Sequence, residues 1–421
     1  MINLDRTAPP SRERWPPIRK SFTDSTHRCR APQETLAAYE PLMPALGITR
    51  LANITGLDRI GIPVVVAIRP ASRGLATAQG KGFDLASAKA SALMEAIEAW
   101  HAERIESVTR VDTFESLRRE GTAIDVTWLP HRPGRTSRGA RPIVWTLAHE
   151  LMSDAPRWVP LEALSCDFSS VVVRQATFLQ TTNGLASGNH VLEALVHGLY
   201  ELIERDAVTL HFQAGRAQQV ARQIDLETVE SPLGREVLRK LGAADVEVAV
   251  WDCTSDLGVP VLSALILDAP SAQRWRPRGP FRGYGCHASR DIALLRALTE
   301  AVQSRLTYIS GSRDDLFHER FRTLQRMEEE RVLAHHLTGA GTRPFTEVPN
   351  IEHPTFNDDL DDILARLRAA GLHEAAMFDL TRPDVGVPVV KVLVPGLENN
   401  IHHDRNYQPG ARLLRARARA S

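Results

Sequence analysis

Three stretches of the chain carry polar side chains at the same helical spacing of i, i+4 and i+7. At about 100° per residue, each set falls on one side of its helix. The residues around them are mostly Ala, Leu, Ile and Val, so the carboxylates are expected in or beside a hydrophobic core. Unpaired buried carboxylates are costly, which makes a cation, or an anion bound through cations, the expected partner. The three sets are Ser91, Glu95 and Glu98; Glu193, His197 and Glu204, with Glu201 between them; and Arg296, Glu300 and Gln303.

Carboxylates that converge from two or three helices suit Mg²⁺, which prefers oxygen ligands and often binds through a few carboxylates together with substrate phosphates. Arg205 and Arg296 could then neutralise the charge of a transferred phosphoryl group. The alternative for each set is a salt-bridge network between helices. The candidate metal ligands are Glu95, Glu98, Glu193, Glu201 and Glu204.

Two glycine-rich turns precede the first two of these helices. Gln79-Gly-Lys81-Gly offers backbone freedom and a point charge, which together suit a phosphate at a helix entry. Asn183 and Ser187 belong to the second turn, where a residue such as Ser187 could simply cap the helix. The first turn could equally be a bend with an exposed lysine. The spacing of a Walker A motif is absent.

Other chemistries have weaker support. A di-metal carboxylate site in a helix bundle needs Glu-x-x-His on each of two helices, whereas Glu193 and His197 stand at i and i+4. No serine or cysteine has the spacing of a nucleophile elbow, so a hydrolase triad is disfavoured.

Composition limits the class of protein. Of the 421 residues, 43% are hydrophobic and 24% are charged, as in an ordinary globular protein, and the net charge is zero. A nucleic-acid partner bound through charge is therefore not expected. Four scattered cysteines without CxxC spacing argue against a cysteine zinc site. Without a signal-peptide pattern or an 18-residue apolar run, the chain is expected to be cytoplasmic, with no membrane span.

The periodicity indicates an α+β fold. A strand is expected over 62–68, helices over 85–105, 190–212 and 226–241, and a strand over 171–182. Charged helices are expected between 313 and 371. The segment 120–145 is expected to form loops between short strands.

An internal repeat refines this picture. A strand, a polar turn, Gly-x-Pro and a second strand follow one another around Asp252 and Pro260, around Asp379 and Pro388, and more faintly around Leu57 and Pro63. Each copy predicts a hairpin whose second strand begins at proline. We therefore expect antiparallel sheet hairpins with long helices and internal pseudosymmetry.

The three helical motifs resemble the ATP-binding signatures of the YcaO family. Ser91-x-x-x-Glu95-x-x-Glu98 resembles the first signature, although Ala99 stands where arginine is usual. Glu193, followed by Glu201-x-x-Glu204-Arg205, resembles the second, and Arg296-x-x-x-Glu300 resembles the third. The flanking segments, such as Thr26-His-Arg28, look like the TfuA-associated branch. The C-terminal PxPxP of azoline-forming cyclodehydratases is absent.

The resemblance implies a YcaO-like domain that uses ATP and Mg²⁺ to activate a backbone amide of a ribosomal peptide or protein. In the TfuA-associated branch, sulfide or a protein-bound sulfur gives a thioamide, so a TfuA-like partner and a sulfur donor are expected; a homodimer is a family-level expectation. The alternatives are an azoline-forming cyclodehydratase and a scaffold that binds a peptide without turnover.

The residues expected to bind the nucleotide combine these motifs with the two turns. They are Lys81, Ser91, Glu95, Glu98, Asn183, Ser187, Glu193, Glu201, Glu204, Arg205, Arg296 and Glu300. Arg205, Arg296 and Glu300 are the candidate catalytic residues. The expected domains are a partly flexible N-terminal extension over 1–40, a YcaO-type ATP-binding catalytic domain over 41–400, and a C-terminal tail over 401–421.

Overall fold

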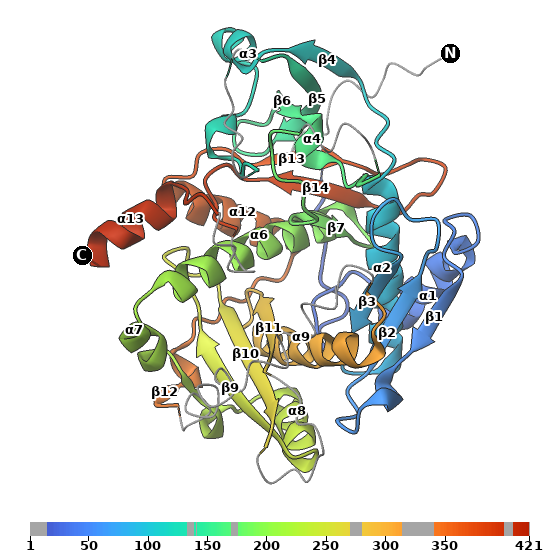
Figure 1. Cartoon of the computed structure of the whole chain (residues 1–421), viewed down its shortest axis with the longest axis vertical. Helices are drawn as coiled ribbons and strands as arrows, with labels where there is room; N and C mark the ends of the chain where they lie inside the picture. The colour runs from blue at the N-terminus through green and yellow to red at the C-terminus, as the bar shows by residue number, and fades with distance from the viewer. Residues whose placement is uncertain are drawn as a thin grey trace. The chain divides into compact units, whose positions relative to one another are not determined.

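The computed structural model describes residues 15–132, 139, 141–169, 176–269, 280–313, 341–399 and 407–420. It confirms the α+β class with antiparallel sheets (Figure 1). The chain forms two compact units, and each is assembled from separate stretches of sequence. Unit 1 comprises residues 1–21, 97–209 and 353–421, and unit 2 comprises residues 22–96 and 210–352.

Unit 1 is built on a six-stranded sheet of order β4-β5-β13-β14-β7, with β6 also paired to β5. The strands are β4 (Thr109–Asp112), β5 (Ile143–Glu150), β6 (Ala155–Pro160), β7 (Leu185–Ser187), β13 (Ala376–Asp379) and β14 (Val389–Leu393). All of these pairings are antiparallel. The helices are α3 (Phe114–Glu120), α4 (Leu161–Leu164), α12 (Phe356–Ala369), α13 (Ala411–Ala420), the short η5 (Val126–Trp128), most of α6 (Val191–Gln213) and the end of α2 (Leu85–Ala102).

Unit 2 contains two three-stranded antiparallel sheets, β1-β2-β3 and β11-β10-β9, and a short parallel pair, β12 with β8. The strands are β1 (Arg50–Asn53), β2 (Val64–Ile68), β3 (Thr77–Lys81), β8 (Ile224–Asp225), β9 (Val246–Asp252), β10 (Val261–Asp268), β11 (Phe281–Cys286) and β12 (Arg343–Pro344). The helices are α1 (Pro32–Tyr39), η3 (Glu40–Leu42), η4 (Thr55–Leu57), α7 (Arg216–Ala221), η6 (Leu226–Thr228), α8 (Pro232–Ala243), α9 (Arg290–Ser310) and η7 (Phe345–Glu347). A core of buried Ile, Leu, Val, Ala and Phe side chains joins α9 and α8 to β9, β10 and β11.

The repeated hairpins predicted from the sequence have the same turn contacts. In each turn an Asn or Asp Oδ1 accepts the backbone N–H of a threonine two residues later, at 3.1, 2.9 and 2.8 Å. The threonine Oγ1 then accepts the N–H of the residue that begins the second strand, at 3.1, 3.2 and 3.2 Å. The residues are Asn53, Thr55 and Val64; Asp252, Thr254 and Val261; and Asp379, Thr381 and Val389.

A strand followed by a long helix also recurs, as β3 before α2, β7 before α6, and β11 before α9 (Figure 1). Ser91, His197 and Arg296 each stand the same number of residues after the end of the strand that precedes their helix (81 to 91, 187 to 197, 286 to 296). Glycines let helix and strand backbones touch: a Cβ on Gly80 would lie 2.1 Å from Ala92 N, and one on Gly285 would lie 2.1 Å from Ala293 O. The polar triplets therefore begin at the same distance along the chain from the strand that precedes each helix. The internal pseudosymmetry remains a prediction.

Several boundaries differ from the sequence predictions. The predicted helix over 226–241 begins at Pro232, because Ser231 caps it, and residues 226–228 form a separate 3₁₀ turn. Residues 176–182 of the predicted strand over 171–182 form only an isolated bridge, between Phe178 and His131. The rest of that strand, like residues 314–340 of the predicted charged helices, lies outside the described residues; α12 lies within the predicted helical span.

Residues at the start of the described chain are tied to unit 1. Lys20 forms a buried ion pair with Asp359 at 2.8 Å, and Ile18 N–H donates to the side chain of Asn357 at 2.8 Å. The limits predicted at residues 40 and 400 remain predictions. Within the described residues, no helix is long and apolar enough to cross a membrane.

Candidate functional site

Glu98 and Ser187 connect the first motif helix with strand β7 in unit 1. Ser187 donates to Glu98 Oε1 twice, from its backbone N–H at 2.8 Å and from its hydroxyl at 2.7 Å. Two donors on one oxygen fix the position of the carboxylate. Ser187 ends β7 and does not cap α6, which begins at Val191; its side chain instead holds a motif carboxylate.

Helix α6 presents the second set of carboxylates. Glu193 and Glu204 are both 2% exposed, as predicted, whereas Glu201 is 20% exposed. Glu193 Oε1 accepts the backbone N–H of Asn189 at 3.2 Å and its side-chain amide at 3.4 Å. Arg205 reaches back to Glu201 and to Glu204, each at 3.2 Å.

The Asn183-Gly184 turn contributes a backbone donor to the same helix. Gly184 N–H donates to Glu201 Oε2 at 3.0 Å. Gly184 has φ of +75°, and a Cβ there would lie 2.5 Å from Val392 O, so only glycine fits. The turn, Glu201 and Arg205 therefore form one connected group.

The third motif and the first glycine-rich turn meet in unit 2. Lys81 forms an ion pair with Glu300, and Glu300 Oε1 also accepts the backbone N–H of Tyr284 at 3.2 Å. Gln303 donates to the carbonyl of Gln79 at 2.8 Å. The lysine and the carboxylate are 18% and 23% exposed, so both remain accessible to a ligand.

Not every predicted residue lies as expected. Glu95 is exposed rather than set in the core, because the buried face of α2 is formed by Ala92, Leu93, Ala96 and Ile97. Ser91 and Arg296 are half-buried, and the Cβ of Arg296 lies over Gly285 of β11. Glu95, Ser91 and Arg296 belong to unit 2, while Glu98, Asn183 and the motif residues of α6 belong to unit 1.

The donor chemistry fits a magnesium-bound nucleotide. Unit 1 contributes the carboxylates of Glu98, Glu193, Glu201 and Glu204, all of them oxygen ligands of the kind Mg²⁺ prefers. Within the described residues, no three Asp, Glu, His or Cys side chains are arranged to hold a metal ion by themselves. A few carboxylates completed by phosphate oxygens match Mg²⁺ better than an all-protein cage does.

One Glu-x-x-His spacing does occur, from Glu98 to His101, but the imidazole is built into the helix packing. His101 is 1% exposed, and its Nδ1 lies 2.8 Å from the carbonyl oxygen of Ile97. Burial lowers its pKa, so the ring is neutral near pH 7.

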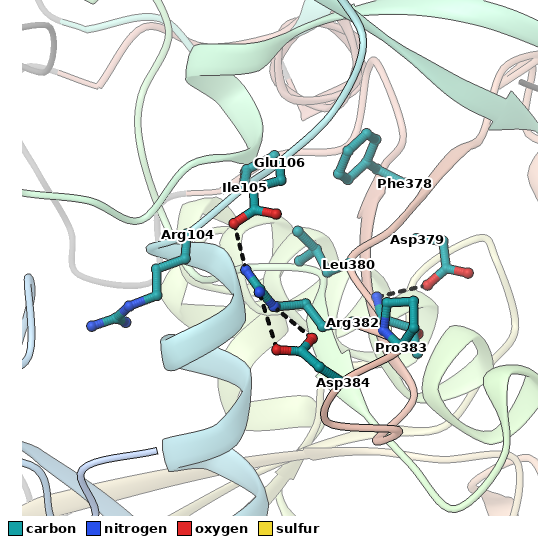
Figure 2. A pocket seen from close by; sticks show the side chains of 10 residues that line it. Arg104, Ile105, Glu106, Phe378, Asp379, Leu380, Arg382, Pro383 and Asp384 are labelled. Carbon is teal, nitrogen blue, oxygen red and sulfur yellow. Dashed lines mark hydrogen bonds and ion pairs between the residues drawn. The ribbon is translucent and has the colours of Figure 1, made fainter. Parts of the chain in front are cut away.

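A separate pocket of unit 1 is lined by residues 104–106 and 378–384 (Figure 2). Arg382 pairs there with Glu106 at 2.7 Å and with Asp384 at 3.0 Å. Its guanidinium also lies 5.4 Å from the ring centre of Trp100. None of the predicted site residues lines this pocket.

Sequence reasoning missed the partners of α6 that come from the end of the chain. Arg412 contacts Asp206 through two hydrogen bonds of 2.9 Å, and the N–H of Glu398 donates to Asp206 at 3.0 Å. Lys391, 1% exposed in β14, lies near Glu201. Asp206 stood beside a recognised motif, but no local pattern indicates Arg412 or Lys391, because both pairings join residues far apart in sequence.

Comparison with known proteins places these residues in a family. A family model described as YcaO cyclodehydratase, ATP- and Mg²⁺-binding, matches residues 79–398. A protein of Methanothermobacter thermautotrophicus is 38% identical over 371 residues, covering 87% of this chain and 94% of its own. A Rhizobium leguminosarum bv. trifolii protein, named for its place in the tfuA 3′ region, is 34% identical over 382 residues, covering 90% of each chain.

Solved structures show the same fold. The structure of YcaO from Methanopyrus kandleri bound with AMPPCP and Mg²⁺ has a TM-score of 0.72 at 24% identity, covering 93% of this chain and 98% of that one. A heterocyclase in complex with substrate and cofactor has a TM-score of 0.73 at 23% identity, covering 92% of this chain and 54% of that one. The YcaO-like fold expected from the sequence is thereby confirmed.

Proposed function

The chain belongs to the YcaO family of ATP- and Mg²⁺-binding enzymes, and we propose that it phosphorylates a backbone amide of a ribosomal peptide or protein in order to install a thioamide. The observation that carries the proposal is the set of fixed carboxylates on α2 and α6, with Glu98 held by two donors of Ser187. The tfuA 3′ location in the name of a relative supports a TfuA-like partner.

The proposed nucleotide site combines the three motifs and the two glycine-rich turns. Glu95, Glu98, Glu193, Glu201 and Glu204 would hold Mg²⁺, which neutralises phosphate charge when bound. Arg205 and Arg296 would stabilise the charge that develops on the transferred phosphoryl group. Lys81, held by Glu300, would contact a phosphate. Ser91, Asn183 and Ser187 would complete the polar lining.

The proposed reaction makes a poor leaving group into a good one. Sulfide adds to the amide carbon, forming a C–S bond as the C=O π electrons move to oxygen. The oxyanion attacks the γ-phosphorus of ATP, the co-substrate, and ADP leaves. The C–O bond then breaks, phosphate departs with the electron pair, and the sulfur loses its proton as C=S forms.

A second candidate keeps the same ATP site but uses a Cys, Ser or Thr side chain of the substrate as nucleophile, giving an azoline. The family description as a cyclodehydratase favours this alternative. We also propose a sulfur donor, a homodimer and a cytoplasmic location for this protein. Membership of the family does not establish these three properties.

Mass spectrometry distinguishes these reactions. A candidate peptide is incubated with the protein, a TfuA-like partner, Mg²⁺, ATP and sulfide. Exchange of oxygen for sulfur with ADP release supports thioamidation, whereas loss of one water without need for sulfide supports azoline formation. Glu204→Gln is the matched control, since an enzyme loses ATP turnover while a scaffold has none to lose. Binding of peptide without ATP turnover by the unaltered protein would contradict both reactions.

A further inference from the structure

Lys391 is a buried cation that the site described above does not use. It stands in β14 and is only 1% exposed, and its ammonium donates to the carbonyl oxygen of Thr181 at 2.5 Å. A lysine charge is costly to bury unless negative charge lies nearby. The groups around Lys391 therefore indicate which negative charge the ammonium interacts with.

The charges that act on Lys391 come from Glu201 and Cys166. Burial lowers the pKa of Lys391, while Cys166 and the carboxylate of Glu201 raise it. Cys166 Sγ also donates to the Thr181 carbonyl, at 3.6 Å, and burial raises the pKa of this thiol, so it is neutral near pH 7. Glu201, which also pairs with Arg205 at 3.2 Å, is consequently the negative group that acts on the ammonium.

The turn between Thr181 and Gly184 connects the same two residues structurally. Lys391 holds the Thr181 carbonyl at one end of this turn. At the other end, Gly184 donates its N–H to Glu201 at 3.0 Å and accepts the N–H of Val392, the neighbour of Lys391, at 2.8 Å. A change at Lys391 therefore acts on Glu201 through charge and through the turn.

We propose that Lys391 is a positioning residue that places a positive charge near Glu201, on the side of the Thr181–Gly184 turn, so that Mg²⁺ binds with the nucleotide rather than before it. The inference rests on the proposed function. The carboxylates of Glu98, Glu193, Glu201 and Glu204 give unit 1 a negative charge that attracts Mg²⁺, although they are not arranged to hold the ion without other ligands. The ammonium of Lys391, acting on Glu201, weakens that attraction and strengthens the attraction for a polyphosphate.

Isothermal calorimetry tests the proposal with MgCl₂ alone and with a non-hydrolysable ATP analogue alone. Lys391→Gln removes the charge but retains a donor for Thr181, and Lys391→Arg retains the charge. We expect the Gln variant to bind Mg²⁺ about three- to tenfold more tightly and the nucleotide more weakly by a similar factor. The Arg variant should stay within about twofold of the unaltered protein for both ligands.

Loss of packing would give a different result. If Lys391 has only a structural role, both variants should bind both ligands more weakly, and that result would overturn the proposal. A Gln variant that binds Mg²⁺ no more tightly than the unaltered protein would also overturn it. If the Gln variant does not fold, Lys391→Met also removes the charge. A Mg²⁺ titration of its refolded fraction then compares the Mg²⁺ affinity without the charge with that of the unaltered protein. An unaltered protein that binds no Mg²⁺-nucleotide instead contradicts the proposed function itself.

Discussion

Arg412, at the start of α13, donates two parallel hydrogen bonds to the carboxylate of Asp206, in the middle of α6. Each bond is 2.9 Å long. Both side chains are buried, at 5% and 0% exposure. Glu398 completes the contact, because it accepts the N–H groups of Gly410 at 3.0 Å and of Leu413 at 2.8 Å. The end of the chain is thereby fixed to the helix that carries Glu204 and Arg205.

Removing the guanidinium should leave Asp206 as an unpaired buried charge. We expect Arg412→Ala to lower the free energy of unfolding by about 3–5 kcal/mol. Chemical denaturation of the variant and the unaltered protein measures this difference. Arg415→Ala is the matched control on the exposed side of α13 and should change the value by about 0.5 kcal/mol or less. Equal effects of the two substitutions would contradict a structural role for the Asp206 clamp.

His211 should make the protein sensitive to acid. Burial, together with the charges of Arg222 and Arg282, lowers its pKa from 6.5 to about 4. A depressed pKa contributes stability that is present above pH 6.5 and is lost as the pH falls towards 4, because the unfolded chain takes up the proton first. The loss amounts to about 3 kcal/mol.

Urea denaturation at a series of pH values checks this slope. His211→Gln should flatten the fall in unfolding free energy between pH 6.5 and 4. His373→Gln, at an exposed position, is the control and should leave the slope as it is. An unchanged slope in the His211 variant would show that other groups cause the acid sensitivity.

The Ser187 hydroxyl should matter for nucleotide binding through Glu98. Ser187→Ala removes the 2.7 Å hydrogen bond and leaves the backbone donor, so the carboxylate is less well fixed. We expect affinity for Mg²⁺-ATP to fall by about five- to tenfold, the equivalent of one hydrogen bond. Equilibrium binding of a fluorescent ATP analogue measures the change.

Ser263 provides a matched control for this experiment. It is also fully buried, but its hydroxyl has no hydrogen-bond partner within the described residues. Ser263→Ala should leave nucleotide affinity unaltered. A similar loss in both variants would assign the effect to general destabilisation rather than to the contact with Glu98.

Lys81 and Glu300 should act as a pair. We expect Lys81→Met and Glu300→Gln each to reduce ATP turnover by about tenfold or more, and the double variant to lose less than the product of the two, because they share one ion pair. Steady-state ADP release measures all four proteins. Lys89→Met, on α2 outside the proposed site, controls for loss of a lysine. Strictly multiplicative losses would refute the coupling.

The sequence by itself determined the polar triplets and the hairpins. Helical spacing among apolar residues predicted α2, α6 and α9, and the Gly-x-Pro repeats predicted β2, β10 and β14, because these signals are local. The resemblance of Ser91, Glu95 and Glu98 to a family signature led to ATP and Mg²⁺, which the family match then confirmed.

Tertiary structure alone decided which carboxylate meets which donor. Ser187 could have been an ordinary helix cap, yet it binds Glu98, 89 positions away in sequence. Glu95 fits the same helical pattern as Glu98 but is exposed, since alanines with Leu93 and Ile97 form the buried side of α2. The partners Lys391 and Arg412 came from β14 and α13, because charges in a core are paired by packing between distant segments, which no local spacing encodes.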